Sequence, residues 1–352
     1  MTLVRTTEAA ILWKNNSPLV VDEIELPDAL QVGQVLVELI SSGICGAQIN
    51  EIDAVKGPDK FLPHLLGHEG FCRVLDVGTG VKNVRSGDLA IMHWRPGKGI
   101  QSEPPNYKWK GKSLNAGWVT TFNKHAIVSE NRLTKILPQE TDKLTLPLLG
   151  CALTTALGVL ENEARVSFRD KLLIFGAGGV GLALIKLARY LGVSDITIVD
   201  LDSSKLELAR RLGATSTILF SSKENCESQI REQYVNFLPS VAIDTSGQMA
   251  CIELCYELSS KDARVVLVGV PRAGEKISIY TLPLHFGKTI KGTEGGGSLP
   301  NIDIPVLLDL LDNGNLELND FPRSTYPLTD INTALRDLRS GFPGRMVIDF
   351  GA

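Results

Sequence analysis

The stretch Leu172-Leu-Ile-Phe-Gly-Ala-Gly-Gly-Val-Gly181 decides the fold of much of this chain. It is a short apolar strand, a glycine-rich turn of the form G-x-G-x-x-G, and the first turn of a helix. In such a turn Gly176 permits the tight bend, Gly178 lets a pyrophosphate approach the backbone, and Gly181 lets helix and strand pack closely. The N–H groups at the start of the helix then face the phosphates. The stretch therefore predicts a dinucleotide-binding turn.

The residues after this turn alternate between strand-like and helix-like patterns. Helical spacing over 179–191 leads to an apolar strand over 196–199, and the alternation continues to about residue 293. Such alternation is typical of a parallel sheet with helices on both faces. We therefore expect an α/β fold here, a doubly wound parallel sheet of the Rossmann type.

The second strand of this region ends in an acid, Asp200. It lies about twenty residues after the glycine turn, where a carboxylate accepts hydrogen bonds from the ribose hydroxyls of the adenosine half. A carboxylate there repels a 2′-phosphate, and no arginine follows closely, so the sequence favours NAD over NADP. The alternative interpretation is a glycine turn that binds no nucleotide.

Composition and charge exclude several classes of protein. The 352 residues are 43% hydrophobic and 22% charged, which is enough apolar material for a large core. A net charge of −4 argues against a dedicated nucleic-acid or anionic-membrane binder. Six cysteines are too sparse for a disulfide scaffold, and neither a targeting nor a membrane-spanning segment is visible. We expect a cytoplasmic protein with reduced thiols.

Three separate motifs hold residues of the kind that bind zinc. GICG at 43–46 contains Cys45, GHEG at 67–70 contains His68, and Gly150 precedes Cys151. Two thiolates, one imidazole and an open position would form a catalytic zinc site if the fold brings them together. Glu69, beside His68, would support the site or exchange with a ligand. Taken singly, a buried cysteine is more often core than ligand, so this hypothesis depends on all three motifs.

Taken together, these features resemble the zinc-dependent alcohol dehydrogenases of the medium-chain dehydrogenase/reductase family over essentially the full chain. The matching segments are GICG, GHEG, Gly150-Cys151, GAGGVG at 176–181, the Asp200 strand end, 268–270 and 291–293. The resemblance implies a Rossmann NAD-binding domain over 152–293. It also implies a GroES-like, mainly β catalytic domain made of residues 1–151 and 294–352. Members form homodimers or homotetramers and act on small alcohols or carbonyl compounds.

The resemblance also implies roles for single residues. Cys45, His68 and Cys151 would hold one catalytic zinc, and Thr155 would lie against the nicotinamide ring. Arg345 would bind the cofactor pyrophosphate. The expected cofactor-binding residues are Gly176, Gly178, Gly179, Val180, Gly181, Asp200, Leu201, Lys205, Val268, Gly269, Val270, Thr293 and Arg345.

The chain departs from the family pattern in two places. Many members have a four-cysteine lobe for a structural zinc, whereas residues 95–117 contain no cysteine, so we expect no structural zinc. This segment is rich in Lys, Trp and Pro, and it is either a loop packed on the domain or a partner, or a lid over the substrate. Ala47 replaces the usual Ser or Thr of the proton relay, and Gln48 replaces an acid that often supports the zinc histidine. Candidate replacements for the relay are His93, Asn115, Glu294 and water. Of these we expect His93 to be a catalytic residue.

The expected function is hydride transfer between NAD and a secondary alcohol, polyol or sugar-derived alcohol at a zinc site. The missing relay motivates an alternative, in which tightly bound NAD oxidises the substrate transiently, as in an epimerase or lyase. A non-catalytic NAD-binding or redox-sensing protein stays open, because fold alone does not fix function. We expect a small-molecule substrate, and neither nucleic acid nor membrane as a partner.

Overall fold

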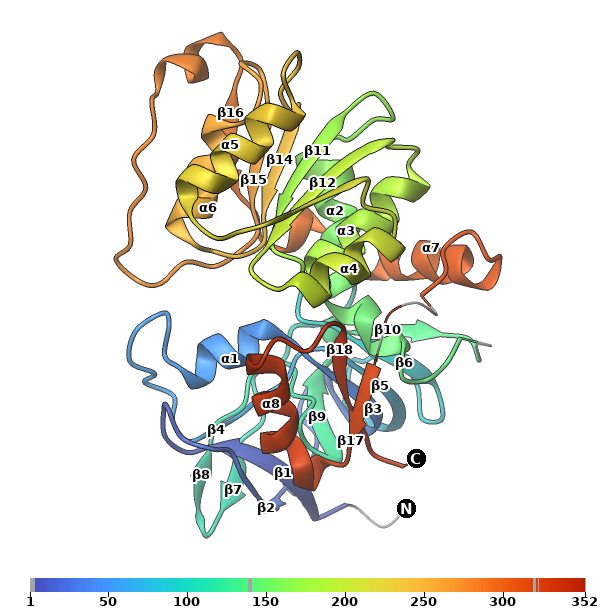
Figure 1. The fold of residues 1–352 in the computed structure, drawn as a ribbon. Helices are drawn as coiled ribbons and strands as arrows, with labels where there is room; N and C mark the ends of the chain where they lie inside the picture. The colour runs from blue at the N-terminus through green and yellow to red at the C-terminus, as the bar shows by residue number, and fades with distance from the viewer. Residues whose placement is uncertain (1–3, 139–140, 319–320, 322, 352) are drawn as a thin grey trace. The chain divides into compact units, whose positions relative to one another are not determined.

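The computed structural model describes residues 4–138, 141–318, 321 and 323–351 (Figure 1). The chain forms two compact units. The first comprises Met1–Cys151, Leu299–Gly314 and Phe321–Ala352, and the second comprises Ala152–Ser298 and Asn315–Asp320. None of the helices in the described ranges is both long enough and apolar enough to cross a membrane.

The described part of the first unit contains two sheets. One has the strand order β4-β1-β2-β7-β8, and the other has the order β10-β6-β5-β3-β18-β17, with β9 also paired to β3. The strands of the first sheet are β1 (Thr6–Leu12), β2 (Val20–Glu25), β4 (His64–Leu65), β7 (Tyr107–Trp109) and β8 (Lys112–Leu114). Those of the second are β3 (Gln34–Ile44), β5 (Gly70–Val77), β6 (Leu89–Met92), β9 (His125–Ser129), β10 (Leu133–Ile136), β17 (Arg323–Tyr326) and β18 (Arg345–Asp349).

Helices cover parts of these sheets. They are α1 (Gly46–Ile52), α7 (Pro300–Asp312), α8 (Ile331–Arg339) and the short helices η1 (Glu130–Arg132), η2 (Leu146–Gly150) and η6 (Leu328–Asp330). The apolar face of α8, with Ile331 and Leu335, packs in one cluster with Ile44 of β3 and Met346 of β18. This packing fixes the end of β3, where the GICG motif lies.

The cysteine-free segment 95–117 contains a β-hairpin that is part of the first unit. The Tyr107 side chain is fully buried, and its hydroxyl accepts a hydrogen bond from the Ile127 backbone N–H at 2.7 Å. The indole N–H of Trp109 donates to Asp22 on β2 at 2.9 Å. These contacts favour the packed-loop interpretation of the segment over the lid.

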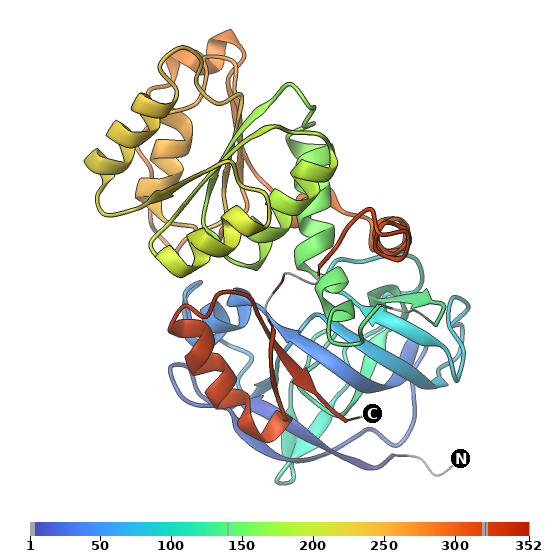
Figure 2. The same cartoon turned by 45° about the vertical axis from the view of Figure 1, so that its right-hand side comes forward.

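The second unit contains a parallel sheet with the strand order β13-β12-β11-β14-β15-β16. Its strands are β11 (Lys171–Phe175), β12 (Asp195–Asp200), β13 (Ser216–Leu219), β14 (Val241–Asp244), β15 (Arg264–Leu267) and β16 (Thr289–Gly292). Its helices are α2 (Ala152–Gly158), α3 (Gly179–Tyr190), α4 (Ser203–Arg211), α5 (Lys223–Gln233), α6 (Met249–Glu257) and the short η3 (Val159–Glu163), η4 (Leu282–Phe286) and η5 (Gly295–Gly297). Figure 2 shows helices on both faces of this sheet. Along the chain the strands are added outward from β11 to β13 on one side, and then from β14 to β16 on the other side of β11. This change of direction is typical of dinucleotide-binding folds, and the predicted doubly wound sheet is confirmed.

Candidate functional site

The strand register of the first unit brings the first two zinc motifs together. β3 and β5 pair antiparallel with Ser42 opposite Gly70, so that Cys45, just beyond β3, lies near His68, just before β5. On its other side β3 pairs with β18, and Met346 lies opposite Ile44. This pairing places Arg345, the first residue of β18, at the same end of the sheet.

The side chains of Cys45, His68 and Cys151 form one cluster. The two sulfur atoms and one imidazole nitrogen all lie within 4.8 Å of one another. Cys151 directly follows η2, which contacts β3, β5 and β6. The fold thus assembles three residues that are far apart in the sequence.

The donor atoms of this cluster fit a zinc ion. Nδ1 of His68 lies 2.7 Å from the side-chain amide of Gln48, whereas its Nε2 is buried without a hydrogen-bond partner. The hydrogen bond between the two thiols holds the pKa of Cys45 well below its ordinary value, with His68 acting in the same direction, and holds the pKa of Cys151 well above it, so Cys45 is the thiolate of the pair. Two sulfurs and an imidazole are a tetrahedral zinc donor set that leaves a fourth position for substrate.

A buried ion pair lies next to this cluster. Arg345 donates to Oε1 of Glu69, and both side chains are nearly or fully inaccessible to solvent. Burial raises the pKa of Glu69 to about 7, although the Arg345 charge opposes this shift. Oε2 of Glu69 has no hydrogen-bond partner, which leaves one carboxylate oxygen for exchange with a metal ligand. The expected contact of Arg345 with a pyrophosphate stays a prediction.

Because two glycines of the zinc motifs have no side chain, there is room for Glu69 beside them. A Cβ atom on Gly43 would lie 2.3 Å from Oε1 of Glu69. A Cβ atom on Gly150 would lie 2.2 Å from the Met92 carbonyl oxygen and 3.2 Å from Cα of Glu69. Any larger residue at these two positions would displace the acid or the strand beside it.

The structure gives no support to the expected catalytic role of His93. Its ring is fully buried, with Nδ1 2.7 Å from the Arg95 carbonyl oxygen and Nε2 3.0 Å from the Thr134 hydroxyl. Burial lowers the pKa of His93 to about 4, so the ring is neutral at pH 7. Because both nitrogens are already hydrogen-bonded, the ring is a structural link between β6 and β10. The amide of Asn115 is likewise already hydrogen-bonded, since its NH₂ group donates to the Phe61 carbonyl oxygen at 2.7 Å.

The glycine turn of the second unit has the geometry that a dinucleotide requires. Gly176 has a φ of 98°, and a Cβ on Gly181 would lie 1.9 Å from the Gly176 carbonyl oxygen. A Cβ on Gly178 would contact nothing within 4 Å, so the backbone there is open. Oδ2 of Asp200 accepts the Ala177 backbone N–H at 2.6 Å, which ties the end of β12 to the turn.

Apart from Thr155 in α2, the predicted residues of this unit follow the carboxyl ends of the strands or lie on the helices that begin there. Gly179 and Val180 begin α3, Leu201 is exposed after β12, and Lys205 is on α4. The backbone N–H groups of Val268 and Gly269 both donate to the Asp244 carbonyl, at 2.8 and 3.0 Å, and the exposed Val270 follows them. The Thr293 hydroxyl donates to Glu163 at 3.0 Å, and Thr155 is buried in α2. Their contacts with a cofactor stay predictions.

Asp244, at the carboxyl end of β14, was not predicted from the sequence. Its buried carboxylate accepts the backbone N–H groups of Ser246 and Gly247, at 3.1 and 2.8 Å, and so shapes the loop after β14. The signal was available as an acid at the carboxyl end of the fourth strand, followed by Thr-Ser-Gly247.

Comparison with protein families decides the assignment. Residues 31–139 match the alcohol dehydrogenase GroES-like domain, and residues 179–313 match the zinc-binding dehydrogenase domain. The chain belongs to the zinc-dependent medium-chain alcohol dehydrogenase family. The resemblance deduced from the motifs and the GroES-like plus Rossmann fold are thereby confirmed.

Relatives of this alcohol dehydrogenase family member align over nearly the whole chain. S-(hydroxymethyl)glutathione dehydrogenase of Synechocystis sp. is 28% identical over 98% of this chain and 100% of the relative. The enzyme of that name from Haemophilus influenzae is 27% identical over 98% and 97%. A crystal structure of an alcohol dehydrogenase zinc-binding domain protein from Burkholderia ambifaria has a TM-score of 0.89 and 26% identity, with 99% and 100% coverage. Benzyl alcohol dehydrogenase of Acinetobacter calcoaceticus shares the fold, with a TM-score of 0.86 and 23% identity over 98% and 99%.

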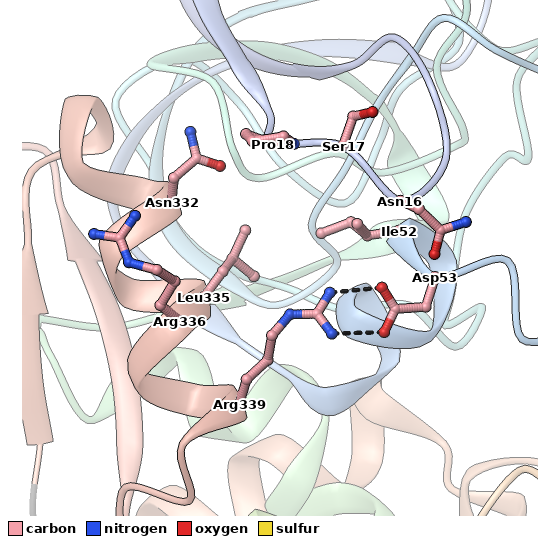
Figure 3. Close-up of a pocket in the computed structure, with 9 residues that line it drawn as sticks. All are labelled: Asn16, Ser17, Pro18, Ile52, Asp53, Asn332, Leu335, Arg336 and Arg339. Carbon is pink, nitrogen blue, oxygen red and sulfur yellow. Dashed lines mark hydrogen bonds and ion pairs between the residues drawn. The ribbon is translucent and has the colours of Figure 1, made fainter.

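The first unit of this alcohol dehydrogenase also has a surface pocket of about 350 Å³ at the far end of α1 (Figure 3). The Arg339 guanidinium closes one side by pairing with both oxygens of Asp53, each at 2.6 Å. Ile52 and Leu335 form an apolar part of the lining. Asp53 caps the carboxyl end of α1, whereas Cys45 caps its start, so the pocket is distinct from the metal-ligand cluster.

Proposed function

We propose that this protein oxidises an alcohol, or reduces the corresponding carbonyl compound, with NAD at a single zinc site. The observation that carries the proposal is the Cys45–His68–Cys151 cluster with its unpartnered imidazole nitrogen. The dinucleotide turn with Asp200 in the same chain supports NAD as the hydride acceptor. The proposed substrates are secondary alcohols, polyols and sugar-derived alcohols. The names of the relatives add S-(hydroxymethyl)glutathione to the candidates.

The protein's own residues would divide the work. Bound zinc supplies Lewis-acid polarisation of a substrate oxygen, and NAD supplies the hydride acceptor. The lowered pKa of Cys45 keeps a thiolate at the site, and Arg345 holds Glu69 beside it. Ala47 offers no hydroxyl for a proton relay, and the His93 ring and the Asn115 amide are already hydrogen-bonded, which leaves Glu294 and water as candidates; of these we propose that water carries the substrate proton away.

Zinc content and NAD reduction test this proposal together. We expect about one zinc per chain in the wild type and loss of both zinc and turnover in Cys45→Ser, across a panel of the alcohols named above. The matched control is Cys72→Ser, because Cys72 is a fully buried thiol that lies outside the cluster and hydrogen-bonds the Ala90 carbonyl. Unchanged turnover in Cys45→Ser would contradict the zinc role, and two zinc ions per chain would contradict the single site. NAD that co-purifies without net NADH formation would favour transient oxidation instead.

We further propose that the protein is a homo-oligomer joined through β16. This strand ends the sheet order in the described part of the second unit, and its outer edge offers unpaired backbone groups to another strand. In the segment that leads to it, Tyr280 and Phe286 are 69% and 70% exposed. A second copy of β16 related by a two-fold axis would cover both features. Light scattering should give a dimer or tetramer mass, and Phe286→Glu should lower it; a monomeric wild type would contradict the proposal.

A further inference from the structure

The side-chain amide of Gln48 connects the start of α1 to the histidine of the zinc cluster. Gln48 is fully buried, and its Oε1 accepts the Cys45 backbone N–H at 2.8 Å. Its Nε2 lies 2.7 Å from Nδ1 of His68. Because a backbone N–H can only donate, the amide oxygen must face Cys45, and the NH₂ group must therefore face His68.

This arrangement sets the tautomer of His68. An NH₂ group only donates, so Nδ1 of His68 must accept, and the proton of the neutral ring is then on Nε2. Nε2 of His68 is the ring nitrogen without a hydrogen-bond partner, so it is the one left to bind a metal together with the two cysteine sulfurs. In order to bind zinc, Nε2 must lose its proton, and a neutral ring then carries the proton on Nδ1. Two donors would then face each other across 2.7 Å.

We propose that Gln48 is a positioning residue that opposes the zinc-binding tautomer of His68, so that zinc loading breaks the hydrogen bond at the start of α1. The amide relieves the conflict with His68 by turning over, which directs its oxygen to Nδ1–H. The NH₂ group then faces the Cys45 N–H, which loses its acceptor. One amide has a single accepting end, so it serves Cys45 or His68 but not both. This inference rests on the proposed zinc site.

A carboxylate in the same place would have no such conflict, because it has an accepting oxygen for each of the two N–H groups. We therefore expect Gln48→Glu to bind zinc about 10–100-fold more tightly than the wild type, the range over which hydrogen-bond partners of metal ligands change metal affinity. Gln48→Met removes both ends of the amide. It should bind zinc at least as tightly as the wild type, because an opposing donor is lost.

Competition with a chromophoric zinc chelator measures these affinities without any enzyme assay. Asn50→Asp is the control for added charge, because it places a carboxylate on the same helix, two residues beyond Gln48. Gln48→Glu should exceed this control by at least about tenfold. A Gln48→Met protein that binds zinc more weakly than the wild type would overturn the inference, since Gln48 would then support the histidine.

Nitrogen-15 NMR of the His68 ring and amide hydrogen exchange at Cys45 give a second readout. We expect the proton on Nε2 without metal and on Nδ1 with zinc, with faster exchange of the Cys45 amide in the zinc-loaded wild type but not in Gln48→Glu. A Cys45 amide equally protected in both states would overturn the coupling. A wild type that binds no zinc would instead refute the proposed function, so the two failures are distinguishable.

Discussion

Arg345 and Glu69 form a buried ion pair that links the first residue of β18 to the residue before β5. Both strands lie beside the metal-ligand cluster, because each pairs with β3. The pair therefore links the segment that carries His68 to β18, which pairs with β3 at the same end of the sheet.

Removal of one partner of this pair should destabilise the protein. Arg345→Met leaves the buried Glu69 side chain without its partner, and because the pKa of Glu69 is already about 7 beside Arg345, its carboxyl group is then protonated at pH 7. We expect a loss of about 1–3 kcal/mol in the free energy of unfolding from the buried polar atoms that lose their partner. Urea denaturation with zinc kept saturating measures this loss. The double variant with Glu69→Gln should lose little more than Arg345→Met alone, because Glu69 has no partner left to lose. Additive losses in the double variant would contradict the coupling.

The pair Arg339–Asp53 is the exposed control for this prediction (Figure 3). Its side chains are 40% and 28% exposed, so solvent screens the interaction although the contact is bidentate. Asp53→Asn should cost no more than about 1 kcal/mol in the same experiment. Equal losses from both pairs would show that burial is not the reason for the larger effect.

The burial of His93 should make stability depend on pH. Its pKa is about 4 in the folded protein and about 6.5 in an unfolded chain, so the unfolded state binds more protons between these values. The contribution is complete above pH 6.5 and is lost as the pH falls toward 4. Between pH 7.5 and pH 5.0 the wild type should lose about 2 kcal/mol that His93→Asn does not lose. Denaturation at the two pH values checks this, and the exposed His285 gives the control variant His285→Asn.

Alanine substitutions at two glycines of the dinucleotide turn should impair different properties of the protein, one its stability and the other its NAD binding. Gly181→Ala forces a methyl group against the Gly176 carbonyl, and we expect it to cost about 3 kcal/mol or more in stability. Gly178→Ala meets open space, so the protein should fold normally but bind NAD at least about tenfold more weakly, because the methyl group takes the place of the pyrophosphate. Thermal unfolding and NAD titration separate the two effects. A stable Gly181→Ala that binds NAD normally would contradict the assignment.

Asp200 should determine the choice between NAD and NADP. Asp200→Asn removes the negative charge that repels a 2′-phosphate, but its single accepting oxygen serves only one of the two backbone N–H groups, of Ala177 and Asp202, that the carboxylate accepts. We expect the preference for NAD over NADP to fall roughly tenfold, with a small loss of stability of about 1 kcal/mol. Ratios of kcat/KM for the two cofactors give the measurement. An unchanged ratio would mean that another group excludes the 2′-phosphate.

The sequence predicted the nucleotide-binding unit better than the zinc environment. The turn at 176–181 and Asp200 are local features, since strand, turn and helix follow one another directly along the chain. By contrast, the sequence suggested His93 as a catalytic group. Only packing shows that both of its nitrogens are already hydrogen-bonded by β10 and a neighbouring carbonyl. The sequence also did not predict that residues 95–117 contain a hairpin paired with β2.

The sequence by itself determined which chemical groups the protein has: two cysteines and a histidine in glycine-flanked motifs, a phosphate-binding turn, and an acid at a strand end. Tertiary structure alone decided which of them meet. The register of β3 with β5 and β18 gathers Cys45, His68 and Arg345, and η2 adds Cys151. It also decided that the Gln48 amide contacts both Cys45 and His68. Such contacts depend on which distant strands pair, and because these pairings join segments far apart along the chain, a local pattern of residues does not select them.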